Sequence, residues 1–114
     1  DTVLTDVFVL NWPKGAAVRV IGNSVTDALD GRLMGHDPAT LPREVIAHDS
    51  GQPLLRFSTD SPMRHTSGAL EEMALYAGQG VGMIHEVIPA AERLRRMVEE
   101  AAACLGRLGA GAGR

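Results

Sequence analysis

The amino-acid sequence predicts a mainly α-helical chain with two short strands. Apolar residues recur three and four positions apart between Pro89 and Leu105, which is the spacing of a helix with one apolar face. Residues 70–77 repeat that spacing over two turns. β-branched and aromatic residues gather instead in residues 1–10 and 16–21, so the strands are expected there.

The first 21 residues are expected to form these two strands, joined by a turn. Residues 1–10 (DTVLTDVFVL) carry apolar side chains on both faces of a strand, so packing on both sides is expected. Asn11–Gly15 contains proline and glycine and interrupts the pattern. In residues 16–21 (AAVRVI), Arg19 stands between two valines and should point away from them, toward solvent or a charged partner.

A helix is predicted from Val25 to about Met34. Ser24 suits the N-cap position, and Asp27 follows three residues later as an acidic form of the capping box. Gly35 is expected to stop this helix.

A second short helix is predicted over Leu41–Asp49. Pro42 fits a first helical position, and Glu44 follows in the first turn, where the helix dipole favours an acidic side chain. Ser58–Ser67 is a polar loop of ten residues, and loops of this length often line or cover a functional site.

Glycines are concentrated directly after the predicted helix of residues 70–77. Gly78, Gly80 and Gly82 fall within five residues, although each glycine costs a helix interior roughly 1 kcal/mol relative to alanine. Either the backbone adopts positive φ there, or a neighbouring helix or a ligand comes too close for a Cβ atom. Gln79 is the long polar side chain among them and can both donate and accept hydrogen bonds. A glycine-rich helix junction inside a core is the simpler interpretation.

The last predicted helix runs from Pro89 to about Leu105. Its apolar face is expected to pack against something, while its arginines and glutamates face water. Gly106–Arg114 (GRLGAGAGR) is rich in glycine and is expected to be a disordered tail.

Length and composition limit the possible functions. With 114 residues and a net charge of −3, the chain suits one modest domain and carries no basic patch for nucleic acid. No apolar run approaches the roughly 20 residues that a membrane span needs. Cys104 is the single cysteine and cannot form an internal disulfide, which suits a reducing compartment, so a cytoplasmic location is expected.

The sequence contains no self-contained active site or metal site. Glu71 and Glu72 are adjacent, and adjacent helix residues do not face each other, so they are no catalytic pair. The Gly78–Gly82 run follows a predicted helix and not a strand, which argues against a dinucleotide fingerprint. The four histidines lack the close spacing of zinc ligands: His36, His48, His65 and His85.

Two stretches resemble the C-terminal end of nitronate monooxygenases, flavin enzymes formerly called 2-nitropropane dioxygenases. The first stretch is Met73–Ile84 (MALYAGQGVGMI), followed by residues 89–92 (PAAE) and a long amphipathic helix. The second comprises residues 1–5 (DTVLT), Trp12-Pro13 and residues 18–23 (VRVIGN). The resemblance covers residues 1 to about 105.

The resemblance implies an FMN-dependent TIM barrel with a smaller helical domain over its mouth, and oxidation of alkyl nitronates with O₂. A barrel of eight β/α units needs roughly 250 residues, so this chain is expected to be the lid-side part of such an enzyme, inactive without the remaining barrel. The family's catalytic histidine lies in a GGH-type segment that no histidine here matches, so no catalytic residue is assigned. The FMN-binding residues that the resemblance implies are Tyr76, Gly78, Gln79 and Gly80.

Three hypotheses follow. The chain is the C-terminal part of an FMN-dependent oxidoreductase, with a barrel as its partner and a small-molecule substrate only when complete. Alternatively, it is a stand-alone interaction module that self-associates through the apolar face of its last helix. A third, weaker hypothesis is a small-molecule pocket around Trp12, Tyr76 and Gln79.

Overall fold

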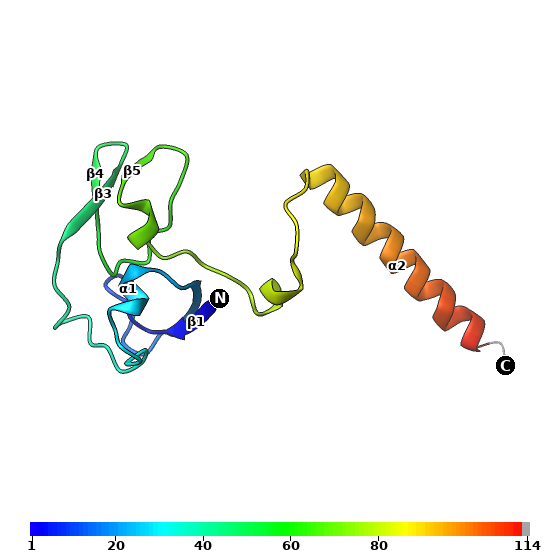
Figure 1. Cartoon of the computed structure of the whole chain (residues 1–114), viewed down its shortest axis with the longest axis horizontal. Coiled ribbons are helices and arrows are strands. Elements are labelled where there is room, and N and C mark those ends of the chain that lie inside the picture. The colour runs from blue at the N-terminus through cyan, green and yellow to red at the C-terminus, as the bar shows by residue number, and fades with distance from the viewer. Residues whose placement is uncertain (113–114) are drawn as a thin grey trace. The chain divides into compact units, whose positions relative to one another are not determined.

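The computed structural model describes residues 1–112, which contain five strands, two α-helices and two 3₁₀ turns. The chain divides into two compact units, Asp1–Val81 and the residues from Gly82 onward (Figure 1). Helix accounts for 31% of the chain and strand for 19%, and the strands form two antiparallel sheets. The prediction of a mainly α-helical chain is therefore wrong.

The first sheet contains both predicted strands, but the first ends at Thr5 and not at Leu10. β1 (Thr2–Thr5) pairs antiparallel with β2 (Val18–Ile21), with Val3 opposite Val20. The Arg19 side chain points to the other face from the two valines, as predicted, but the predicted solvent or charged partner is not what it meets. It is half-buried, and its Nη1 donates to the uncharged Thr2 hydroxyl at 3.1 Å.

The helix predicted over residues 70–77 is absent. A single 3₁₀ turn, η1 (Leu70–Glu72), occupies its start, and Met73 then adopts an extended conformation. Residues 75–77 pair with β2 instead: Ile21 N donates to Leu75 O at 2.8 Å, and Ala77 N donates to Arg19 O at 3.0 Å. Pairing with a strand distant in sequence therefore overrides a helical pattern only two turns long.

The second sheet comprises three strands in the order β4–β3–β5. β3 (Val45–Asp49) lies in the centre, with β4 (Gln52–Leu55) and β5 (Thr66–Gly68) antiparallel on its two sides. Figure 1 shows these strands beside one another at one end of the first unit.

β3 replaces the helix predicted over Leu41–Asp49. Ser50 and Gly51 both have positive φ, at 50° and 82°, and join β3 to β4 as a two-residue hairpin loop. Two consecutive positive φ values match the right-handed twist of paired strands, which favours this type of turn. The Pro42 signal for a helix start is therefore overridden by a hairpin whose turn lies eight residues further on.

Gly68 lets β5 approach β3 closely. Its φ is 126°, and a Cβ atom there would lie 2.5 Å from Ile46 O and 2.6 Å from Ala47 Cα. No other residue type can be placed at this position without moving the central strand.

α1 (Ser24–Asp27) is shorter than the predicted helix of residues 25–34. Asn23, and not Ser24, is the N-cap, because its side chain accepts from the amides of Val25 and Thr26. Thr26 completes the capping box by accepting from Asn23 N at 2.8 Å. The helix then gives way to turns in which Asp30 and Gly31 have positive φ.

The core of the first unit is small. Its buried cluster draws on the segment after β1, on β2, on α1 and on the chain after η1: Val7, Phe8, Val20, Val25 and Ala74. The polar loop predicted over Ser58–Ser67 is confirmed for residues 58–65. Its last two residues, Thr66 and Ser67, belong instead to β5.

The second unit contains one long helix, α2 (Ala90–Ala112). The predicted helix is confirmed, but the tail prediction is wrong for Gly106–Ala112, which is helical; residues 113–114 lie outside the described residues. Glu92 pairs with Arg95 at 2.6 Å and with Arg96 at 2.7 Å, and these hydrogen bonds lower the pKa of Glu92 to about 2.

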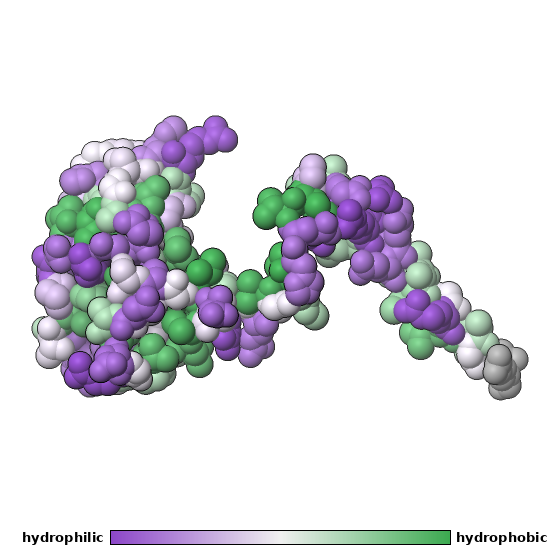
Figure 2. All heavy atoms as spheres, viewed as in Figure 1, coloured by the Kyte–Doolittle hydropathy of each residue, from purple (hydrophilic) through white to green (hydrophobic). Residues whose placement is uncertain are grey.

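No residue of α2 is buried within the described chain. Its apolar face is exposed at Leu94, Met97, Val98, Leu105 and Leu108. Figure 2 shows apolar and charged side chains side by side on the surface of this helix. Neither helix among residues 1–112 combines the length and the apolar character needed to cross a lipid bilayer.

Candidate functional site

Tyr76 lies at the edge of the first sheet, bridged to Val20 of β2. Tyr76 is 41% exposed, and its hydroxyl donates to Thr59 O at 2.7 Å. Partial burial raises the pKa of Tyr76, and the nearby Asp60 carboxylate adds to that rise. The hydroxyl therefore stays protonated near neutral pH and ties the polar loop of residues 58–65 to the sheet.

The three residues that follow Ala77 are exposed. Gly78, Gln79 and Gly80 continue from the sheet edge, and Gln79 begins the 3₁₀ turn η2 (Gln79–Met83). The helix junction inside a core, the simpler of the two interpretations, is therefore wrong.

Glycine was expected here because of a positive φ or because a neighbour comes too close for a Cβ atom. Neither reason applies at Gly78 or Gly82 within the described chain. Both lack positive φ, and a Cβ atom at either would have no neighbour within 4 Å. Space is consequently free for a ligand or partner at Gly78, but the structure itself does not require glycine there.

Asp6 and His36 form a largely buried polar pair in the first unit that no sequence pattern indicated. Asp6 lies directly after β1, with a side chain only 3% exposed, and its Oδ1 is 2.7 Å from His36 Nδ1. A carboxylate only accepts hydrogen bonds, so Nδ1 carries the proton. Asp6 also accepts from the amides of Gly35 at 2.8 Å and His36 at 3.2 Å.

These contacts determine the charge of Asp6. Burial raises its pKa, but the hydrogen bonds from the His36 side chain and from the amides of Gly35 and His36 together outweigh burial, so the pKa is lowered. Asp6 is therefore an anion at neutral pH and holds the loop of residues 33–36 against the end of β1. An acidic residue inside the apolar run of residues 1–10 was the available sequence signal.

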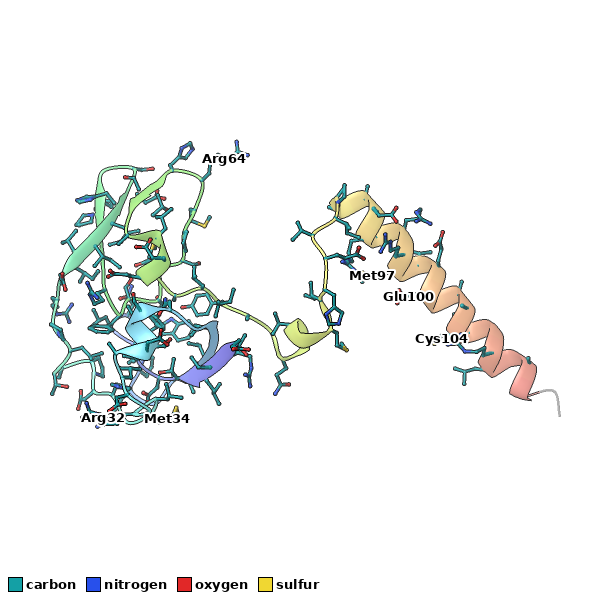
Figure 3. The ribbon with its side chains drawn as sticks, viewed as in Figure 1. Arg32, Met34, Arg64, Met97, Glu100 and Cys104 are labelled. Atoms are coloured by element: carbon teal, nitrogen blue, oxygen red, sulfur yellow. The ribbon has the colours of Figure 1, made fainter. Side chains whose placement is uncertain are left out.

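A cavity of about 330 Å³ opens beside this pair. Its lining combines three apolar side chains with one arginine, one histidine and a glycine: Ala28, Leu29, Arg32, Met34, Gly35 and His36. Figure 3 shows Arg32 and Met34 next to each other at the edge of the first unit. The cavity includes none of Trp12, Tyr76 and Gln79, so it is not the pocket expected around them.

The remaining histidines form no metal site. His48, His65 and His85 are all exposed, and residues 1–112 contain no cluster of three or more histidine, cysteine, aspartate or glutamate side chains placed to hold a metal ion. Cys104 is exposed on α2.

Comparison of the chain with models of known protein families, with curated proteins and with solved structures finds no match.

Proposed function

We propose that this chain is the lid-side part of an FMN-dependent nitronate monooxygenase-like oxidoreductase. The observation that carries the proposal is the resemblance of Met73–Ile84, followed by a long amphipathic helix, to the end of those enzymes. Two structural features support it. Residues 76–80 are available for contact with a ligand or partner, and the apolar face of α2 is uncovered within the described chain.

The exposed segment fits one edge of a flavin and not the whole cofactor. Gln79 offers an amide that donates and accepts, and the open space at Gly78 admits a planar group. Residues 76–80 include no cation to balance a phosphate, so that part of FMN would be held by the barrel. FMN supplies the redox chemistry when bound, and the role of this chain is to orient the cofactor and exclude water.

Reconstitution tests the proposal. A nitronate monooxygenase barrel that lacks its C-terminal region is mixed with this chain, and FMN retention and nitrite release from an alkyl nitronate are measured. We expect both to rise on mixing and to fall with Gln79→Ala. A barrel that gains neither would overturn the proposal.

The apolar face of α2 favours a second candidate, a module that self-associates. An uncovered apolar stripe of this length is an association site. Sedimentation of the chain alone separates the two candidates, because self-association predicts a dimer or larger species and the lid-side proposal predicts assembly only when the barrel is present.

A matched pair of variants identifies the face involved. Val98→Asp places a charge on the apolar stripe, and Ala103→Asp places the same charge on the opposite face. Val98→Asp is expected to abolish assembly, with the barrel or with a second copy, while Ala103→Asp preserves it.

A further inference from the structure

We propose that the cavity beside the Asp6–His36 pair binds a short-chain carboxylate, with its charged group on Arg32 and its alkyl chain against Ala28, Leu29 and Met34. This inference does not depend on the proposed function, because the cavity is built entirely from residues 28–36 of the first unit.

Arg32 supplies the charge. It lines the cavity, and it forms no ion pair within 4.0 Å with any carboxylate of the described residues. The neighbouring Asp37 is held by Lys14 at 3.2 Å, so its carboxylate is already neutralised by a separate cation. A guanidinium binds a carboxylate through two parallel hydrogen bonds, which makes Arg32 well suited to this headgroup.

Asp6 fixes His36 at the wall of the cavity. Because Nδ1 is occupied by the buried carboxylate, Nε2 is the ring nitrogen left for a ligand, and it forms no hydrogen bond to any residue in 1–112. The amide bonds from Gly35 and His36 to Asp6 hold the backbone of this wall in place. The position of the His36 ring is therefore set before a ligand arrives.

The size and lining determine the ligand class. A volume of about 330 Å³ lies at the small end of the range for small-molecule sites, which are lined mainly by apolar side chains with a few polar groups. Ala28, Leu29 and Met34 can cover a short alkyl chain, and a single arginine matches a single negative charge. These features favour a monocarboxylate with an alkyl chain over inorganic phosphate.

An NMR titration of the full chain with sodium butyrate at pH 7 tests the inference, with sodium chloride used to hold the ionic strength constant. We expect saturable shifts of the His36 ring protons and of the amides of residues 28–36. Butylammonium chloride and phosphate should give no saturable shift at these positions. Equal binding of phosphate, or shifts that stay linear with concentration, would overturn the proposal.

Variants locate the binding group. Arg32→Gln is expected to weaken butyrate binding at least tenfold, and Met34→Glu, which adds a negative charge to the lining, should do the same. Arg64→Gln is the matched control, because Arg64 projects from the opposite end of the same unit (Figure 3). Unchanged affinity in Arg32→Gln and Met34→Glu, with spectra that show both variants folded, would refute the assignment.

Discussion

Asp6 joins the end of β1 to the loop of residues 33–36. Its carboxylate accepts three hydrogen bonds from a loop about thirty residues away, although its side chain is nearly inaccessible to water. A buried charge is tolerated only when it is well paired, so the loop of residues 33–36 and the end of β1 depend on each other.

Asp6→Asn is expected to lower the free energy of unfolding by about 1–3 kcal/mol, the cost of leaving a buried polar group poorly satisfied. The asparagine amide group would meet hydrogen-bond donors where the carboxylate accepted them. Urea unfolding at pH 7 measures the change. Asp27→Asn is the control, because Asp27 is exposed and its side chain makes no hydrogen bond within residues 1–112.

The stability difference between the wild type and Asp6→Asn is also expected to depend on pH. The pKa of Asp6 is lower in the folded state than the roughly 3.9 of an unfolded aspartate, so its contribution to stability is present above that pH and is lost as the pH falls through the folded value. The stability difference between wild type and Asp6→Asn should therefore shrink as the pH falls from about 5 through the folded pKa of Asp6. A difference that grows on acidification would contradict the assignment.

At the scale of elements, the glycines separate into those that the backbone requires and those that it does not. Gly68→Ala should lower the free energy of unfolding by about 2 kcal/mol or more, because it combines a positive φ with a Cβ atom inside contact distance of β3. Gly78→Ala meets open space at an ordinary φ, so its effect on the stability of the chain alone should stay within about 0.5 kcal/mol. Urea denaturation of the two variants in parallel tests this ordering.

The start of α1 offers a second test at this scale. Asn23 accepts from two helix amides and also donates to Met73 O at 3.1 Å, so it connects α1 to the chain after η1. Asn23→Ala should cost about 1–2 kcal/mol through loss of the cap. Ser24→Ala should lower the free energy of unfolding much less. A larger effect at Ser24 than at Asn23 would contradict the assignment of Asn23 as the N-cap and favour Ser24, as predicted from the sequence.

These elements show which sequence signals were sufficient to predict a helix or a strand. The apolar residues of α2 recur at helical spacing over many turns, and no strand competes for this segment, so the helix could be predicted. Its end could not, because the glycines after Leu105 favour a tail over a helix. β1 and β2 followed from their β-branched residues. The helices predicted over 41–49 and 70–77 failed because both segments gain backbone pairing from strands elsewhere in the chain, and short local patterns carry no information about such partners.

The predicted site shows the same limit. The resemblance implied FMN contacts at Tyr76, Gly78, Gln79 and Gly80, and of these Tyr76 lies at the edge of the first sheet while Gln79 begins η2. Asp6 and His36 are thirty residues apart, and their pairing depends on the docking of the turn after α1. The sequence marked Asp6 only as a charge in an apolar run, so the cavity beside it could not be predicted.

At the scale of the whole molecule, the division into two units makes a direct prediction. All members of the buried cluster lie before Val81, so α2 contributes no residue to this core. A chain ending at Ile84 should unfold at the same urea concentration as the full chain, within error, and its amide spectrum should overlay for residues 1–75. A large loss of stability on truncation would show that α2 supports the first unit.

The pairing of β2 with two neighbours also has a mechanical consequence. β1 and residues 75–77 both run antiparallel to β2, so they run parallel to each other on its two sides. Tension applied between Asp1 and Ala77 would slide these outer strands along the middle one and load the backbone hydrogen bonds together, instead of peeling them apart one by one. The unit should therefore resist stretching from its ends more strongly than its modest core suggests, and single-molecule pulling at those two points, compared with pulling at Ser50 and Ala77, would reveal the difference.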